Sequence, residues 1–309
     1  LESVQLRWAD AVIRETPLRI ELAGKELFGI VTEPVHVDAG AICAVLLNGG
    51  ALRHTGPNRS WVEIARRWAA RGVPTVRFDL QGIGDSEGDE QSLVSNPALY
   101  APASTEQTLA ILDQLARSEL PDRFVLAGLC SGAYWALHCA LRDTRVAAAL
   151  MINLYSFYWS EALVAERETS RALAALRGRG WRRMLRRDVS LKELTGIVQS
   201  VRPSRLRSGA QLPVELAQKE QVEQALDLLR ERGTQALMLF SHDEALYDQL
   251  IRQGLIDKLD RWPNLQIERI PSRDHMFRAL WLQRQVHDSV DRALDRVLAA
   301  LPATPKPPR

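Results

Sequence analysis

A pentapeptide near the middle of the chain has the residue types and spacing of a nucleophile held in a tight turn. Gly128-Leu-Cys130-Ser131-Gly132 follows an apolar run of strand length, and an amphipathic helical pattern continues from it. A strand-to-helix turn of this kind folds the backbone so sharply that only glycine or alanine fits two positions before and after its apex. Cysteine at the apex predicts chemistry by a thiolate nucleophile.

The glycine spacing distinguishes two neighbouring candidates for the nucleophile. An apex at Ser131 would put Leu129 and Ala133 at the flanking positions, where leucine does not fit. Cys130 is therefore the expected nucleophile, and the helix dipole favours a thiolate at the start of a helix. The backbone N–H of Ser131 can donate to an oxyanion. A glycine-rich turn beside a buried structural cysteine is the alternative interpretation of the pentapeptide alone.

Three further segments follow predicted strands in an order that suits this chemistry. Leu46–Gly50 ends a strand upstream, where the N–H of Gly50 is expected as a second oxyanion donor. Asp79–Ser86, with the pattern Asp-x-x-Gly-x-Gly-x-Ser, follows the next strand. His275 lies in the loop before the last predicted helix, where it is expected to take the thiol proton as general base. His54, just after the first of these segments, either lines the site or belongs to a plain loop.

Together these motifs resemble the α/β-hydrolase superfamily, particularly its serine aminopeptidase-like and thioesterase-like branches. The resemblance covers about residues 18 to 301 except Tyr155–Leu216. Two departures stand out. Cys130 replaces the usual serine, as it does in dienelactone hydrolases and certain aminoacyl-shuttling enzymes, and Asn48-Gly49 replaces the usual His-Gly.

The resemblance also implies an acid between the nucleophile and the histidine in chain order. It aligns Glu244 with the family's aspartate and leaves Asp243 and Asp248 as alternatives. The resulting hypothesis is a triad of Cys130, His275 and Glu244 that needs neither a metal nor an organic cofactor.

Apolar runs of strand length alternate with amphipathic helical patterns along the chain, which predicts an α/β fold with a mostly parallel sheet covered by helices on both faces. A capping box from Ser104 to Gln107 is expected to start one of the helices. The expected strands are Leu18–Leu22, Leu27–Thr32, Ile42–Leu47, Thr75–Leu80, Phe124–Ala127, Val146–Ile152, Ala236–Phe240 and Leu265–Ile270, and the expected helices are Asn58–Ala70, Ser104–Arg117, Gly132–Leu141, Gln221–Arg232 and Leu280–Leu301.

Residues 155–216 interrupt this alternation with helical segments only. We expect an inserted helical cap there, over a core of residues 1–154 and 217–301, and a disordered proline-rich tail at 302–309; an ordinary pair of crossover helices is the alternative. The cap carries twelve basic and six acidic residues. Such a charge would steer an acidic carrier protein or a phosphopantetheine arm, although a solvated helix face explains it equally.

Composition bears on the partners and the location of the protein. The 309 residues are 46% hydrophobic and 25% charged with a net charge of +2, which gives no indication of a nucleic-acid or membrane partner. Three scattered cysteines predict reduced thiols and a cytoplasmic location.

Two classes of function follow. The first is an acyl-handling enzyme, either a thioesterase or esterase or an acyltransferase, which takes small acyl esters or thioesters, including carrier-bound ones. The second is a catalytically silent binding protein of the same fold. The presence of both Cys130 and His275 favours the enzyme.

Overall fold

The structure, a computed structural model, describes residues 2–35, 41–89, 96–160 and 214–301. The chain divides into two compact units, one of Leu1–Phe157 with Val222–Arg309 and one of Tyr158–Gln221. Only residues 158–160 and 214–221 of the second unit are described. Most of the predicted cap, including all of its basic residues, therefore lies outside the described residues, whereas Cys130, His275 and Glu244 are all described. The tail at 302–309 lies outside the described residues as well.

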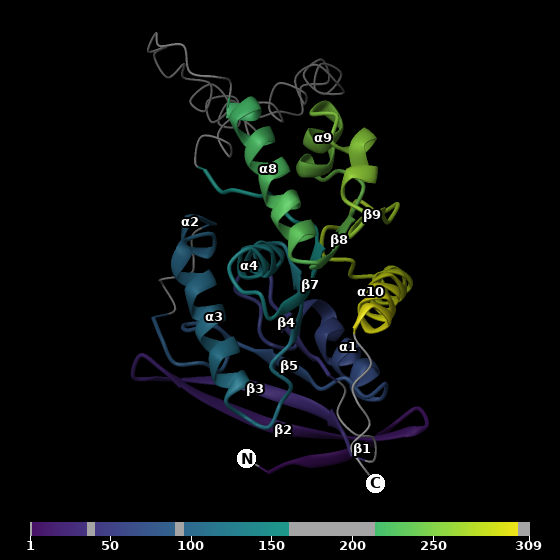
Figure 1. The fold of residues 1–309 in the computed structure, drawn as a ribbon. Helices are drawn as coiled ribbons and strands as arrows, with labels where there is room; N and C mark the ends of the chain where they lie inside the picture. Colours follow the sequence, from purple (N-terminus) through teal and green to yellow (C-terminus); the bar gives the residue numbers. More distant parts are fainter. Residues whose placement is uncertain (1, 36–40, 90–95, 161–213, 302–309) are drawn as a thin grey trace, which may run out of the picture. The chain divides into compact units, whose positions relative to one another are not determined.

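Within the described residues, nine strands form one sheet in the order β1-β2-β3-β5-β4-β6-β7-β8-β9 (Figure 1). The first three form an antiparallel meander, β3 is antiparallel to β5, and the strands from β5 to β9 are parallel to one another. The strands are β1 Val4–Trp8, β2 Ala11–Leu22, β3 Lys25–Pro34, β4 Cys43–Leu47, β5 Thr75–Phe78, β6 Phe124–Leu129, β7 Val146–Ile152, β8 Gln235–Phe240 and β9 Leu265–Arg269. The predicted mostly parallel sheet is confirmed.

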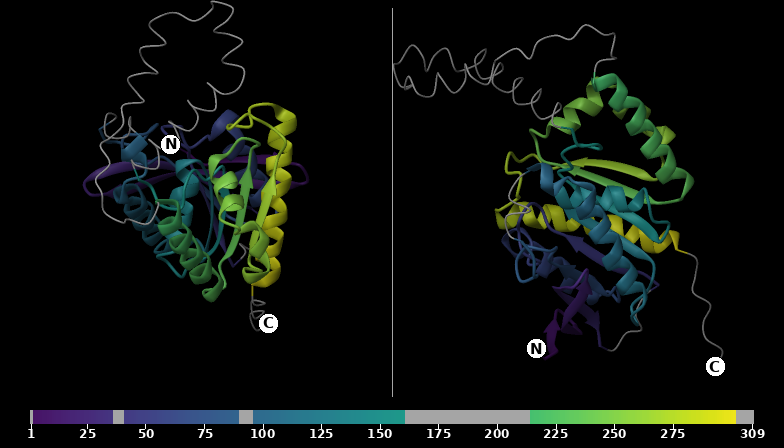
Figure 2. Two further views of the ribbon diagram at one scale, coloured as in Figure 1. Left: turned by 90° about the horizontal axis from the view of Figure 1, so that it is seen from above. Right: turned by 90° about the vertical axis from the view of Figure 1, so that its left-hand side faces the viewer.

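Helices cover both faces of this sheet, with α1 and α10 on one face and α3 and α4 on the other (Figures 1 and 2). The α-helices are α1 Ser60–Ala69, α2 Asn96–Leu99, α3 Pro102–Ala116, α4 Ser131–Ala140, α8 Val214–Glu231, α9 Ala245–Arg252 and α10 Leu280–Ala300. Two 3₁₀ turns, Pro57–Arg59 and Ile256–Arg261, complete the set in the described ranges. No helix in these ranges is both long enough and apolar enough to cross a lipid bilayer.

The central strands are buried on both faces, which is why they appear in the sequence as continuous apolar runs. Every residue of β6 and β7 is buried. Because successive strand residues face opposite sides, Val125, Ala127 and Leu129 pack in one cluster with α1 and α10. Burying each large side chain of such a cluster contributes roughly 1.5–3 kcal/mol. The rigid sheet that results holds the loops at its carboxyl edge, where ligands bind in α/β proteins.

The expected start of one helix is wrong. The helix expected from Ser104 starts at Pro102, and its N-cap, Ala101, has no side-chain capping bond. Ser104 is buried within the helix, while Gln107 accepts a hydrogen bond from the backbone N–H of Gln81 at 2.8 Å instead. Proline suits the first helical turn because its missing N–H would have no partner there, so it starts the helix before the predicted box.

Candidate active site

Cys130 lies at the apex of a strained turn between β6 and α4. Its backbone has φ 56° and ψ −113°, a conformation that costs free energy for any residue with a side chain. A Cβ added to Gly128 would lie 2.2 Å from the carbonyl carbon of Gly132, and one added to Gly132 would lie 2.4 Å from the carbonyl oxygen of Leu47. Both glycines are therefore required by backbone contacts, for the reason that the sequence suggested.

Ser131, the other hydroxyl or thiol residue of the turn, is fully buried as the first residue of α4. Its Oγ accepts a hydrogen bond from the backbone N–H of Gly50 at 2.8 Å, and its own N–H donates to the Cys130 sulfur. Gly50, expected as an oxyanion donor, thus lies against the side chain of Ser131 at the elbow. Cys130 is half-buried and is the more accessible of the two side chains.

His275, from the loop after β9, connects the thiol to an acid. Its Nδ1 donates to Oε1 of Glu244 at 2.7 Å, which leaves Nε2 for the hydrogen bond that His275 makes with the Cys130 thiol. Glu244 precedes α9, and its Oε1 also accepts from the Ser241 hydroxyl at 2.7 Å. The structure therefore brings Cys130, His275 and Glu244 together in one row.

The two alternative acids point elsewhere. Asp243 is exposed and pairs with His242 at 2.6 Å and with Arg273 at 3.2 Å. Asp248 lies one turn further on, within α9. Of the three acids considered, only Glu244 contacts the imidazole of His275.

The row of three residues favours charge separation between the thiol and the imidazole. Burial by itself would raise the pKa of the Cys130 thiol, but the hydrogen bonds from His275 and Tyr100 outweigh it and lower that pKa. Burial would likewise lower the pKa of His275, and its bonds to Cys130 and Glu244 instead raise it to about 10. Burial raises the pKa of the Cys43 thiol to about 12. The surroundings of Cys130 thus favour its thiolate, whereas burial disfavours the thiolate of Cys43.

Tyr100 also belongs to this site, and the sequence analysis missed it. It follows α2, and its hydroxyl lies 3.5 Å from the Cys130 sulfur. Thirty residues separate the two in the chain. Neither a motif nor a strand end marks Tyr100, and only the packing of α2 against α4 reveals it.

Asn153 is a second residue that the sequence analysis missed, and it connects the loops that carry the histidine and the acid. It is fully buried and has φ 48°. Its Nδ2 donates to the carbonyl oxygen of His275, and its Oδ1 accepts from the backbone N–H of Ser241, both at 2.7 Å. A polar residue directly after the apolar run of β7 was the available signal, because the ends of parallel strands meet at one edge.

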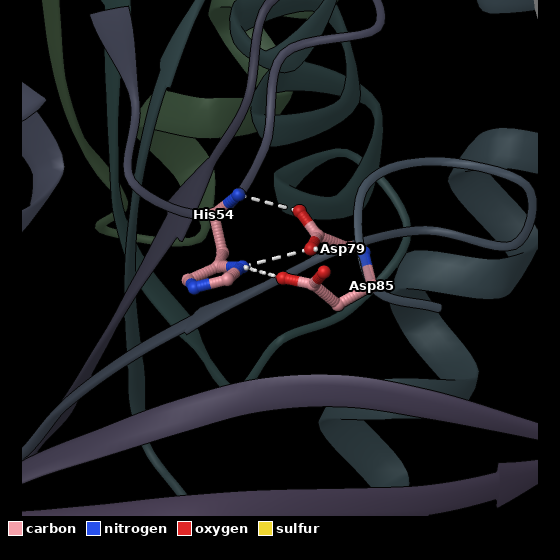
Figure 3. A group of neighbouring side chains, drawn as sticks. All are labelled: His54, Asp79 and Asp85. Carbon is pink, nitrogen blue, oxygen red and sulfur yellow. Dashed lines mark hydrogen bonds and ion pairs between the residues drawn. The ribbon is translucent and has the colours of Figure 1, made fainter. Parts of the chain in front are cut away.

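The described residues contain one group with metal-ligand chemistry, formed by His54, Asp79 and Asp85 (Figure 3). Their ligand atoms lie within 4.8 Å of one another. However, Asp79 accepts hydrogen bonds from the backbone and ring of His54 and, at 3.1 Å, from the backbone N–H of Asp85. Both carboxylate oxygens are therefore engaged by N–H donors, so the geometry suits a brace between two loops better than a cation site.

This brace also explains the glycine pattern after β5. Gly84 has φ 60°, and a Cβ there would lie 2.3 Å from Oδ2 of Asp79. The carboxylate of Asp79 is completely buried at that point, with His54 closing it from the loop that carries Gly50. The Asp-x-x-Gly-x-Gly-x-Ser pattern thus serves to hold the loop after β4 against the loop after β5.

Comparison with known proteins agrees with this fold. The family model described as "Alpha/beta hydrolase family" matches residues 44–301. No curated protein sequence matches the chain. Solved structures with a similar fold include VinJ, at 16% identity and a TM-score of 0.55 over 91% of this chain and 99% of that one. Proline iminopeptidase from Mycobacterium smegmatis is similar at 15% identity and a TM-score of 0.56, over 92% and 99% of the two chains.

Est1E from Butyrivibrio proteoclasticus, solved with ferulic acid, has 15% identity and a TM-score of 0.54 over 91% of this chain and 99% of that one. At such identities the likeness concerns the fold, whereas the family model covers most of this sequence. This chain belongs to the alpha/beta hydrolase family.

Proposed function

We propose that this protein is a cysteine-dependent acyl hydrolase or acyltransferase that forms a covalent acyl-enzyme on Cys130. The observation that carries the proposal is the unbroken row of hydrogen bonds from the Cys130 thiol through His275 to Glu244, at the apex of the elbow. A nucleophile, a base bonded to it and an acid that orients the base are the parts that acyl transfer requires.

The chemistry proceeds in two halves. The Cys130 thiolate attacks the carbonyl carbon of an acyl ester or thioester, so that a C–S bond forms and the carbonyl π electrons move to oxygen. The N–H groups of Gly50 and Ser131 receive that oxyanion, and Gly50 exchanges its bond to the Ser131 hydroxyl for one to the oxyanion. The tetrahedral intermediate then collapses, and the departing alkoxide or thiolate takes the proton of the His275 imidazolium.

The second half regenerates the thiolate. His275 takes a proton from water, or from an alcohol, amine or thiol acceptor, as that acceptor attacks the thioester carbon. Collapse of the second intermediate expels the Cys130 thiolate, and the imidazolium is restored. Glu244 stabilises the imidazolium in both halves through its bond to Nδ1.

The acyl group is expected to reach either water or another acceptor. A thioester reacts more readily with amines and thiols than an oxygen ester does, so an acyl-cysteine suits exchange between thioesters. We therefore propose acyl thioesters as the preferred substrates, either free or carried by an acidic carrier protein that the basic segment at 167–207 would attract.

The experiment that tests the proposal is intact-mass measurement after incubation with a panel of acyl thioesters and activated esters. The wild-type protein should gain the mass of one acyl group, mapped to Cys130. The Cys130→Ala variant should gain none and should lose turnover, while the matched variant Cys139→Ala, which removes a buried thiol of α4, should keep both. Acylation or turnover that survives in Cys130→Ala contradicts the proposal, and binding without any adduct would favour the silent binding protein.

A further inference from the structure

The Cys130 sulfur has a second side-chain neighbour besides His275. The hydroxyl of Tyr100 lies 3.5 Å from it, and the tyrosine itself is only 6% exposed. This inference rests on the proposed role of Cys130 as nucleophile and concerns what Tyr100 adds to it.

The position of Tyr100 is held by contacts with the helix that begins at the nucleophile. The indole N–H of Trp135, on α4, donates to the carbonyl oxygen of Leu99 at 2.7 Å, and that bond is buried. The Tyr100 ring meets the ring of Tyr134, also on α4, edge to face at 5.0 Å. Tyr100 is therefore fixed relative to Cys130 by two independent contacts, and its approach to the sulfur follows from packing rather than from a mobile side chain.

The direction of the hydrogen bond follows from the charges. Burial, together with the neighbouring Cys130 sulfur, raises the pKa of the Tyr100 hydroxyl, so this hydroxyl keeps its proton. A thiolate can only accept. Tyr100 is therefore the donor once Cys130 has passed its proton to His275.

We propose that Tyr100 is a further catalytic residue, whose hydroxyl donates a hydrogen bond to the Cys130 thiolate each time that thiolate exists. Hydrogen bonds to a charged acceptor are about twice as strong as those between neutral groups. The bond is made to the thiolate before attack, weakens as sulfur becomes bound to carbon, and forms again as the thiolate leaves the acyl group. Tyr100 keeps its proton throughout, and His275 alone exchanges protons with the reacting groups.

This assignment predicts opposite effects on the two halves of the reaction. A thiolate that accepts an extra hydrogen bond is more abundant at neutral pH but less nucleophilic, and it is a better leaving group. Tyr100 should therefore assist deacylation, in which the Cys130 thiolate leaves. In acylation, Tyr100 should raise the rate mainly at pH values below the pKa of the Cys130 thiol, where it increases the fraction of thiolate.

The first test is the pH profile of Cys130 alkylation by iodoacetamide, followed by mass mapping. Among the residues that the structure describes, the ionisable groups facing the sulfur are His275 and Tyr100; Glu244 stands behind His275, and Tyr134 and Tyr155 face Tyr100. In Tyr100→Phe the midpoint of the profile should rise by about one pH unit, so that labelling on the acid side of the midpoint slows roughly tenfold. At the alkaline plateau the variant should react as fast as the wild type or faster. The control Tyr134→Phe, which removes a hydroxyl from the same group of rings, should keep the wild-type midpoint.

The second test is single-turnover kinetics with an acyl thioester, again by intact mass. Tyr100→Phe should accumulate the Cys130 acyl-enzyme, because loss of the donor slows departure of the thiolate. An unshifted midpoint of Cys130 alkylation in Tyr100→Phe overturns the assignment. So does an alkylation rate that falls by the same factor at every pH, including the alkaline plateau, because that result would show a change in the access of iodoacetamide to the thiol. If Cys130→Ala turns over thioesters normally, the proposed function fails by itself, and the alkylation profile still decides whether Tyr100 bonds to the thiolate.

Discussion

Two of the histidine–carboxylate pairs among the described residues are at least partly buried, and they differ in what surrounds them rather than in their own geometry. His275 Nδ1 meets Glu244 at 2.7 Å, and His54 Nδ1 meets Asp79 at 2.8 Å. The side chain of His275 is 37% exposed and its second nitrogen serves a thiol, whereas that of His54 is 8% exposed and its ring packs edge-on against Phe28.

The two carboxylates also differ in the groups that donate hydrogen bonds to them. Asp79 is completely buried, and backbone N–H groups of two loops donate to it along with the imidazole. Glu244 is reached by two side-chain donors, the imidazole of His275 and the hydroxyl of Ser241. A histidine–carboxylate pair is thus a candidate for catalysis only where the second ring nitrogen meets a reactive group. Without such a group, as at His54 and Asp79, the pair is a structural brace.

The largest expected effect is the loss of activity when the histidine of the first pair, His275, is replaced. His275→Gln should reduce kcat by roughly 10²- to 10⁴-fold, because the variant lacks the general base. It should also raise the midpoint of Cys130 alkylation, since the imidazolium that lowers the thiol pKa is gone. Steady-state kinetics and iodoacetamide labelling measure both. Retention of wild-type kcat by this variant would remove the distinction between the pairs.

The next effect is a loss of stability when the carboxylate of the second pair, Asp79, is replaced. Asp79→Asn places an amide NH₂ either against the backbone N–H of His54 or against both the imidazole N–H of His54 and the backbone N–H of Asp85, so a buried donor loses its acceptor in either orientation. The free energy of unfolding should fall by about 1–3 kcal/mol in urea titrations. The kcat of the folded variant should fall less than that of His275→Gln. Normal stability combined with a loss of activity as large as that of His275→Gln would place the second pair in the catalytic machinery.

The smallest effect sharpens the assignment of the acid. Glu244→Gln should cost about 10- to 100-fold in kcat, the range for carboxylates that orient metal-bound histidines, because the thiolate and imidazolium still attract each other. Asp243→Asn is the matched control one residue away, and its turnover should stay near normal because Asp243 pairs with exposed side chains. A greater loss for Asp243→Asn would assign the acid to Asp243.

The parts of this site that could be predicted from sequence are those that depend on neighbouring residues. The two glycines around Cys130 are required by contacts within and beside one turn, so their spacing identifies the apex in any context. The apolar runs of the parallel strands are similarly local, because burial on both faces demands them. The first strand, Val4–Trp8, was not predicted: it is short and partly exposed, and its place in the sheet depends on pairing with β2.

Tertiary structure alone decided which groups meet the thiol and the imidazole. Glu244, rather than Asp243, contacts His275 because of the direction in which the chain leaves Ser241 before α9, and adjacent side chains there point apart. Tyr100 and Asn153 reach the site through the packing of α4 and through the end of β7, over separations of 30 and 122 residues. From the sequence alone came the elbow, the histidine and the class of fold. The resemblance also aligned Glu244 with the family's acid but left Asp243 and Asp248 as alternatives. The contact of Glu244 with His275, the second donor to sulfur and the brace between the loops depend on side-chain directions across the sheet edge, which no local spacing encodes.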